Sequence, residues 1–223
     1  MNLGTLKTHV INRVGNDAIS NVLTEFVNQV QNDIAERHPF SWRETLPVTV
    51  TTIPNQAYLN TSSYLPDFGD PLDAVELSTP RKLVYTKQWD LNLLDPEYVK
   101  SSSTRVGVPT NYYVDSANQR IYFYPVPNGA YQVSVRYLKS PPEISNNSAS
   151  LFIPSQYHHV VVSGVESLAW QLDEDLNSAN AANVRYEAGI QRMIEKDNST
   201  SDYQPIMTSN QAFVDFSDPF KEF

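Results

Sequence analysis

Apolar residues recur at helical spacing near the start of the chain, in two successive stretches. The first stretch carries Leu3, Leu6, Val10 and Val14. The second stretch carries Ile19, Val22, Leu23, Phe26, Val30 and Ile34. Because residues three and four apart share one face of a helix, we predict a helical hairpin here. Gly15 suits the end of its first helix, and Asn16 or Asp17 can cap the second, which must end before Pro39.

The helical spacing returns after residue 154. Pro154 and Ser155 open a predicted third helix, whose apolar stripe consists of Tyr157, Val161, Gly164, Leu168 and Leu172. After the polar sequence DEDLNS, a predicted fourth helix carries Ala182, Tyr186, Ile190 and Met193. Two helical hairpins, each with an apolar stripe to cover, are most simply buried against each other as a four-helix bundle.

Between the helical regions the pattern changes to the alternation typical of β-strands. In YQVSVRYL, side chains 131, 133, 135 and 137 share one face and the polar residues between them share the other, which indicates a half-buried antiparallel strand. LPVTVTTI, DAVEL, TNYYV and RIYFYP predict further strands, and KQWDLNLLDPEYVKSSSTRVG predicts a short helix followed by a loop. Of the 15 prolines, 13 lie between Pro39 and Pro154, where their exclusion from helix interiors favours strands and turns.

The sequence therefore predicts an α+β fold. We expect a four-helix bundle built from the two termini, with an inserted antiparallel β domain and an extended C-terminal arm. The predicted units are a helical hairpin at 1–44, a β-rich insertion at 45–142, a second helical hairpin at 143–197 and the arm at 198–223.

The composition excludes several classes of function. Cysteine is absent, which excludes disulfides, thiolate metal sites and cysteine nucleophiles. The net charge is −9, whereas ordinary DNA-binding proteins are rich in the Lys and Arg that neutralise phosphates. The N-terminal residues have no unbroken apolar stretch behind a basic start, so they do not form a secretory signal. No apolar run approaches the roughly 18 residues of a membrane span. We therefore expect a soluble protein, with no membrane partner, that is assembled in a cytoplasm.

Candidate catalytic residues have simpler structural explanations. His158 and His159 are adjacent on a predicted helix, so their side chains point about 100° apart and cannot share a metal. Asp67 and Asp70 could be paired for glycoside hydrolysis, but they lie in a turn containing Pro and Gly, which Asp favours. The seven glycines form no phosphate-binding motif and no Gly-x-Ser-x-Gly elbow. We predict no enzymatic activity and no cofactor.

One acidic stretch resembles the start of an EF-hand calcium loop. Asp173, Asp175 and Asn177 supply oxygen ligands at its first, third and fifth positions. The sixth position is Ser178, where the turn needs Gly, and the twelfth is Val184, where the loop needs a bidentate Glu. Because both decisive positions fail, we predict a solvated loop between helices and no bound metal.

Residues 198–223 combine many apolar side chains with no helical or strand periodicity. A solvated tail would be poor in aromatic residues, so this surface requires a groove, either on its own domain or on another subunit. We favour an arm that docks on another subunit. Its predicted interface residues are Tyr203, Ile206, Phe213, Phe216, Phe220 and Phe223.

A series of glycines, prolines and tyrosines runs through VGVPTNYYVDSANQRIYFYPVPNGAYQVSVRYLKSPPEI. The spaced positions are Gly107, Pro109, Tyr112, Pro125, Pro127, Tyr137, Pro141 and Pro142. Upstream lies AYLNTSSYLPDFGDPLDAVEL, and downstream lies LFIPSQYHHVVVSGVESLAW with an Ile-Pro-x-x-Tyr helix start. In this order, over roughly residues 5 to 195, the sequence resembles the head-to-tail adaptor (head completion or connector) proteins of tailed bacteriophages. The residues after 198 do not match that pattern.

The resemblance implies a structural protein of the virion neck, without an active site. It implies a ring, commonly of twelve copies, beneath the portal protein at the capsid vertex. Such a ring extends the channel, through which DNA passes without sequence-specific binding, and carries the tail or nozzle proteins. By analogy, the C-terminal arm would bind the portal protein or a neighbouring subunit.

Two other interpretations stay open. A tail terminator or nozzle subunit of the virion would keep the ring and the channel but would lose the portal contact. A carbohydrate-binding β module on a helical stalk would use exposed Tyr and Trp as stacking platforms. Trp42, Trp89 and Trp170 lie in different predicted elements, which disfavours one common platform.

Overall fold

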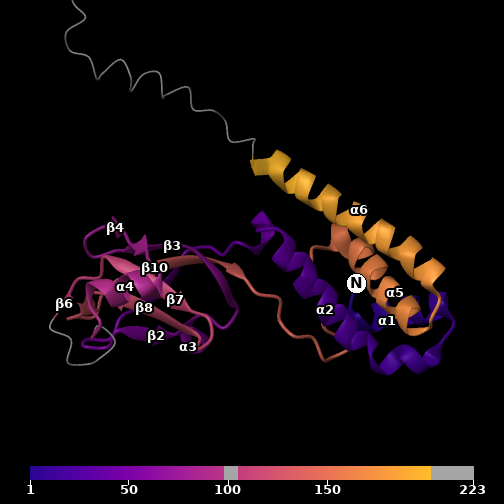
Figure 1. The fold of residues 1–223 in the computed structure, drawn as a ribbon, viewed down its shortest axis with the longest axis horizontal. Coiled ribbons are helices and arrows are strands. Elements are labelled where there is room, and N and C mark those ends of the chain that lie inside the picture. The colour runs from indigo at the N-terminus through magenta and orange to yellow at the C-terminus, as the bar shows by residue number, and fades with distance from the viewer. Residues whose placement is uncertain (98–104, 202–223) are drawn as a thin grey trace, which may run out of the picture.

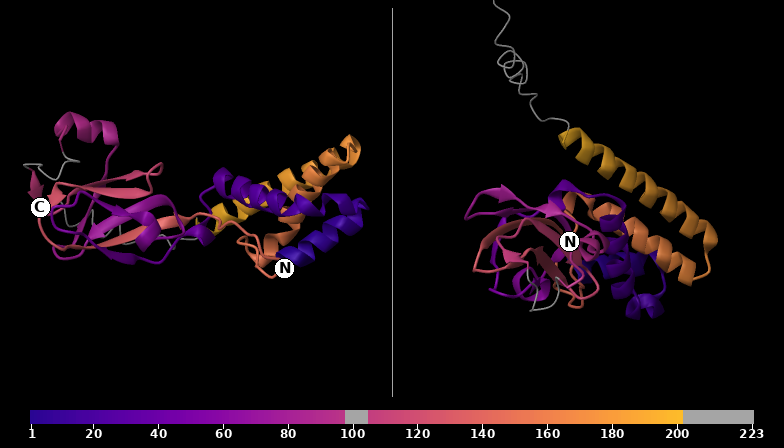
Figure 2. Two further views of the ribbon diagram at one scale, coloured as in Figure 1. Left: turned by 90° about the horizontal axis from the view of Figure 1, so that it is seen from below. Right: turned by 60° about the vertical axis from the view of Figure 1, so that its left-hand side comes forward.

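The computed structural model describes residues 1–97 and 105–201 of the 223-residue chain, which form an α+β architecture in two parts (Figure 1). The helical part consists of α1 (Leu3–Val14), α2 (Leu23–Arg37), α5 (His158–Leu172) and α6 (Leu176–Ser201). The β-rich part comes between α2 and α5 in the sequence and lies at the other end of the long axis of the molecule (Figures 1 and 2). The predicted mixture of helix and sheet is confirmed.

Local signals explain where the first helices begin and end. The Asn2 side chain caps α1 by accepting a hydrogen bond from the Thr5 N–H, and Gly15 ends it in the left-handed region with φ of 76°. Asn16 caps the 3-10 helix η1 (Asp17–Asn21) rather than an α-helix, and α2 begins only at Leu23. The prediction that Asn16 or Asp17 caps the second α-helix was therefore wrong, because the short helix η1 lies between Asn16 and α2.

Helices from both ends of the chain share one hydrophobic core. Its largest fully buried side chains include Leu3, Leu6, Leu23, Ile34, Ile190 and Met193. The helix α5 contacts α1, α2 and α6, so it is covered on most of its circumference. That explains why its predicted single stripe was partly wrong: Val160, Val165 and Ala169 are buried, whereas Leu172 at the end of the helix is exposed.

The described residues of the β-rich part form three small sheets. The first has the order β1 (Val48–Thr51), β10 (Gln132–Lys139), β3 (Phe68–Glu76) and β4 (Arg81–Lys82). The second has the order β2 (Tyr58–Asn60), β8 (Arg120–Tyr124), β7 (Asn111–Asp115) and β5 (Val84–Tyr85). The third pairs β6 (Val106–Gly107) with β9 (Val126–Pro127). Two short helices, α3 (Thr61–Tyr64) and α4 (Gln88–Leu94), lie between strands in the sequence.

The strand β10 has the predicted alternation over most of its length. Val133, Val135 and Tyr137 are buried against β1 and β3, and Gln132 is exposed. The alternation ends at Leu138, which is also buried, because the register with β3 shifts after Arg136 and again after Tyr137. The pairings β5–β7 and β6–β9 are parallel, so the expectation of a purely antiparallel β region was wrong for these short strands.

Candidate functional site

In the β-rich part, one stretch of ten residues exposes four large apolar side chains. They are Val84, Tyr85, Trp89 and Leu93, called here the α4 segment. Trp89 and Leu93 are 68% and 65% exposed and, four residues apart, share one face of α4. Leu91 is fully buried and fixes the helix to the β-rich part. Exposed clusters of large apolar and aromatic residues are typical of protein contact surfaces, so the α4 segment is a candidate interaction site.

Aromatic rings in the second sheet support the α4 segment. The Tyr85 ring lies 5.4 Å from the Tyr112 ring, centroid to centroid, in an edge-to-face contact. The rings of Tyr113 and Tyr122 are stacked at 4.6 Å, in the same buried cluster as Leu91. Burial raises the pKa of Tyr112 to about 12. The exposed side chains of β5 and α4 therefore stand on a well-packed base.

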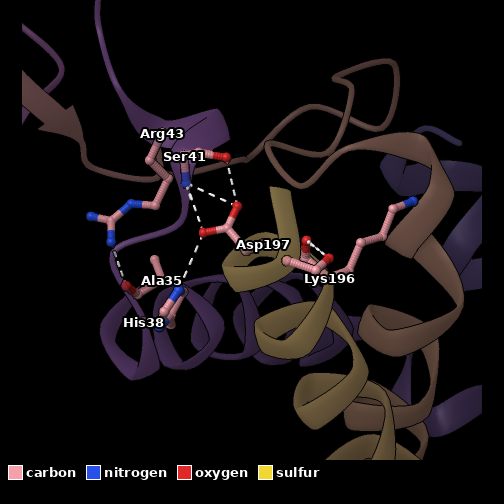
Figure 3. A network of polar contacts seen from close by, with 7 residues as sticks. Ala35, His38, Ser41, Arg43, Lys196 and Asp197 are labelled. Atoms are coloured by element: carbon pink, nitrogen blue, oxygen red, sulfur yellow. Dashed lines mark hydrogen bonds and ion pairs between the residues drawn. The ribbon is translucent and has the colours of Figure 1, made fainter. Parts of the chain in front are cut away.

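Arg43 holds the helical and β-rich parts together. Its Nε atom donates to the Lys139 carbonyl at 2.9 Å. Its Nη1 atom donates to the Ala35 carbonyl near the end of α2 (Figure 3). The Asp70 carboxylate of β3 lies 3.9 Å from Nη2. The side chain is almost completely buried, so its donors must find these partners within the protein. One guanidinium thus connects the end of α2 to two strands of the first sheet.

Asp197 fixes the last turns of α6 to the same junction. Its carboxylate accepts hydrogen bonds from the Ser41 N–H and, at 2.6 Å, from the Ser41 hydroxyl (Figure 3). His38 Nε2 lies 3.2 Å from the Asp197 carboxylate. Because this carboxylate is bonded to the linker between α2 and β1, the end of α6 is anchored next to the β-rich part.

Glu166 carries a carboxylate inside the helical core. Its side chain is 0% exposed, and its two oxygens face arginines from two other helices. Oε1 accepts from Arg13 Nη1 of α1 at 2.9 Å, and Oε2 accepts from Arg185 Nη2 of α6 at 3.2 Å. A buried charge is tolerated only when it is paired and hydrogen-bonded. The pairing therefore also fixes α1 and α6 relative to α5.

The residues predicted as the interface of the C-terminal arm lie outside the described residues. These are Tyr203, Ile206, Phe213, Phe216, Phe220 and Phe223. The helix α6 continues through Ser201, four residues into the stretch predicted as an extended arm. The arm can therefore begin only after the last described residue.

Several other sequence candidates make structural contacts. His158 Nε2 lies 3.0 Å from the Ile153 carbonyl at the start of α5. Asp173 accepts a hydrogen bond from Asn16, and Asp175 accepts one from the Ser178 N–H in the first turn of α6.

Asp67 accepts a hydrogen bond from the Tyr137 hydroxyl, and burial together with this bond raises the pKa of Tyr137. Among residues 1–97 and 105–201, no three His, Asp or Glu side chains are grouped so that they could hold a metal ion.

The three tryptophans do not form a common platform. Trp42 stacks on Phe40, and both Trp42 and Trp170 pack against the helical core, whereas Trp89 is exposed on the β-rich part.

Sequence reasoning missed Glu166 and Asp197, although the single acid within the apolar run VVVSGVESLAW was a signal for Glu166. Within the described part of the chain, no helix is both long and apolar enough to cross a membrane.

These features define a class of protein. Helices from both chain ends enclose one core, and a β-rich insertion projects from it (Figure 1). The insertion carries exposed aromatic side chains, Tyr85 and Trp89. That combination is typical of a protein that functions through contacts with other proteins.

The family is established by a direct match. The model of the SU10 adaptor protein family matches residues 1–210, nearly the whole chain. The chain therefore belongs to this family of phage head-to-tail adaptors, and the resemblance seen in the sequence is confirmed. No curated protein matches the chain. Membership implies a structural rather than an enzymatic role, at the neck of the virion where head and tail meet.

Proposed function

We propose that this phage adaptor forms a ring, of twelve copies, between the portal protein and the tail or nozzle proteins. The ring extends the channel through which DNA leaves the head. The observation that carries the proposal is the family match over residues 1–210, since adaptors of this kind connect portal and tail. The exposed α4 segment supports it, because a structural adaptor needs apolar surface that only its partners cover.

We propose further that the two parts act as separate units within the ring. Helices from residues 1–44 and 143–197 form a four-helix bundle, and residues 45–142 form the inserted β domain. The common core of α1, α2, α5 and α6 supports the first unit, and the separate apolar clusters of the β-rich part support the second. Arg43 and Asp197 give the junction the rigidity that a load-carrying connection needs.

Mixing the purified protein with the portal protein of the same phage tests the proposal. Electron microscopy should show a collar added to the portal ring, and a symmetric reconstruction gives the number of copies. The double variant Trp89→Ser/Leu93→Ser should weaken collar formation or tail attachment, because aromatic anchors dominate interface energies. The variant Asn92→Ser, exposed on the same helix, is the matched control. A protein that binds neither portal nor tail and is absent from virions would contradict the proposal.

A further inference from the structure

A groove of about 520 Å³ lies where α1, α5 and α6 meet on the surface of the helical part. The helix α6 lines it with Arg185, Ala188, Gly189 and Arg192. These positions share one helix face, because they are spaced by three and four residues. From α1 and α5, the groove receives His9, Arg13, His159 and Val162. No carboxylate is among the described residues that line it.

The positive charge in this groove is only partly neutralised by the chain itself. Arg13 and Arg185 bond the buried Glu166, yet their side chains remain 50% and 47% exposed. Arg192 is exposed and makes no hydrogen bond or ion pair with residues 1–97 or 105–201. Three arginines thus stand against one carboxylate, in a protein whose net charge is −9. Such a local field attracts an acidic partner.

The floor of the groove is apolar and formed by small side chains. Val162 and Gly189 are buried, and Ala188 beside them is exposed. Gly189 allows α5 and α6 to approach closely, since a Cβ atom there would lie 2.8 Å from Val160 Cγ2. A floor of this kind accommodates aromatic rings, and guanidinium groups beside it favour the faces of those rings.

We propose that this arginine groove binds residues 202–223 of a neighbouring copy in the ring, an inference that rests on the proposed adaptor function. The sequence of that segment has matching chemistry. It contains four acidic residues, Asp202, Asp215, Asp218 and Glu222, against the single basic Lys221. Between and beside these acids stand Phe213, Phe216 and Phe220. Carboxylates meet the arginines, and phenylalanine rings cover the apolar floor.

Two considerations assign the segment to a neighbour rather than to the same chain. The groove lies between Arg185 and Arg192, nine to sixteen residues before α6 ends at Ser201, or about 14 to 24 Å along the helix. A segment docking on its own groove would have to reverse direction and run back along this helix. Docking in the next copy joins two different surfaces, and such a heterologous contact generates a closed ring when its rotation closes.

The absence of native cysteine makes a direct test possible. Full-length protein with Ala188→Cys in the groove is mixed with full-length protein carrying Ser217→Cys, and the mixture is oxidised both alone at high concentration and in collars with the portal protein. A disulfide between the two chains is expected. Asn183→Cys, exposed on a different face of α6, is the control and should cross-link poorly with Ser217→Cys.

Charge exchange separates specific docking from random collision. Arg192→Glu in the Ala188→Cys chain should slow cross-linking about tenfold. Asp215→Lys/Asp218→Lys in the Ser217→Cys chain should restore part of that rate. Arg192 is suited to this test because it has no partner in the described core, whereas Arg13 and Arg185 stabilise the buried Glu166.

Each alternative result has a defined meaning. A chain carrying both cysteines that forms only an intrachain disulfide shows self-docking and overturns the proposal. Collars that form without any cross-link between chains also overturn it, while leaving the adaptor function intact. Protection of Ala188→Cys from thiol reagents by duplex DNA, without cross-linking to Ser217→Cys, would replace it with a nucleic-acid site. Cross-linking in solution without collars on the portal would support the groove and count against the adaptor function.

Discussion

Glu76, at the end of β3, keeps its charge although it is completely buried. Its carboxylate receives hydrogen bonds from the Thr79 hydroxyl at 2.6 Å and from the backbone N–H groups of Ser78 and Thr79. Burial alone raises the pKa of Glu76, but these bonds outweigh it and lower the pKa to about 2. The ionised side chain therefore stabilises the turn between β3 and β4.

The variant Glu76→Gln should be less stable at neutral pH by about 1–3 kcal/mol, because it loses charge-assisted hydrogen bonds at a buried position. A depressed carboxyl pKa contributes stability above its ordinary value of 4.5, and this contribution is lost as the pH falls toward 2. Denaturant unfolding between pH 5 and pH 2.5 should therefore show a steeper acid-dependent loss of stability in the parent protein than in Glu76→Gln. The exposed Glu143→Gln is the control. Equal acid slopes in the parent and Glu76→Gln would contradict this assignment.

At the scale of elements, α5 is the centre of the helical part. It packs against α1, α2 and α6, and Gly164 allows the close approach of two of them. A Cβ atom at Gly164 would lie 2.9 Å from both Tyr186 Cε2 and Val30 Cγ1. The Tyr186 hydroxyl donates to Asp33 of α2 at 2.6 Å, so α6 is also bonded across to α2. These contacts join helices from the two ends of the chain, so they form only when both ends are present.

The loss of stability caused by large-to-small substitutions in these helices should increase with the burial of the replaced side chain. Leu23→Ala should lower the free energy of unfolding by about 2–5 kcal/mol, because Leu23 is fully buried in the common core. Leu168→Ala should cost less, since Leu168 is only partly buried, and the exposed Leu172→Ala should change stability little. Thermal or denaturant unfolding measures all three. A large loss in Leu172→Ala with none in Leu23→Ala would show that these helices pack differently.

At the scale of the whole molecule, charge is distributed unevenly. The chain has 25 Asp and Glu against 16 Lys and Arg, yet the arginine groove carries three arginines on one face of the helical part. In a ring, we expect basic surface of this kind to be covered by neighbours and acidic surface to face the channel. Phosphates that meet few cations release few counterions, so DNA would pass without adhering.

The channel of the assembled ring is therefore predicted to be lined mainly by Asp and Glu side chains. Electron cryomicroscopy of the neck would locate the residues that face the DNA. A channel dominated by Lys and Arg would contradict the prediction.

Removing residues 202–223 should separate folding from assembly. The truncated protein keeps α6 up to Ser201, including the Asp197 contacts at the junction. We expect its melting temperature to stay close to that of the full chain, while collar formation on the portal protein is lost. Circular dichroism measures the first quantity and electron microscopy the second. Unfolding or aggregation of the truncated protein would show that these residues belong to the core of their own subunit.

Local patterns in the sequence determined the class of fold and most of its elements. The stripes of α1 and α6 and the alternation of β10 were predicted correctly, because spacing along the chain alone decides which residues share a face. Gly15 acts through a backbone contact with Ile11, four residues away, which is why its role could be predicted from the local sequence. The family resemblance also came from the sequence, through prolines, glycines and tyrosines in a fixed order.

Only the tertiary structure decided which contacts connect distant segments. Asp197 meets Ser41 across 156 residues, and Arg43 meets Lys139 across 96, so no local pattern could reveal either pair. The stripe of α5 was misjudged for the same reason: how many sides of a helix are buried depends on how many helices surround it. The arginine groove likewise combines residues of α1, α5 and α6, and no local pattern in the sequence explains why these positions are charged or small. Spacing determines which side chains share a face, and packing determines what that face meets.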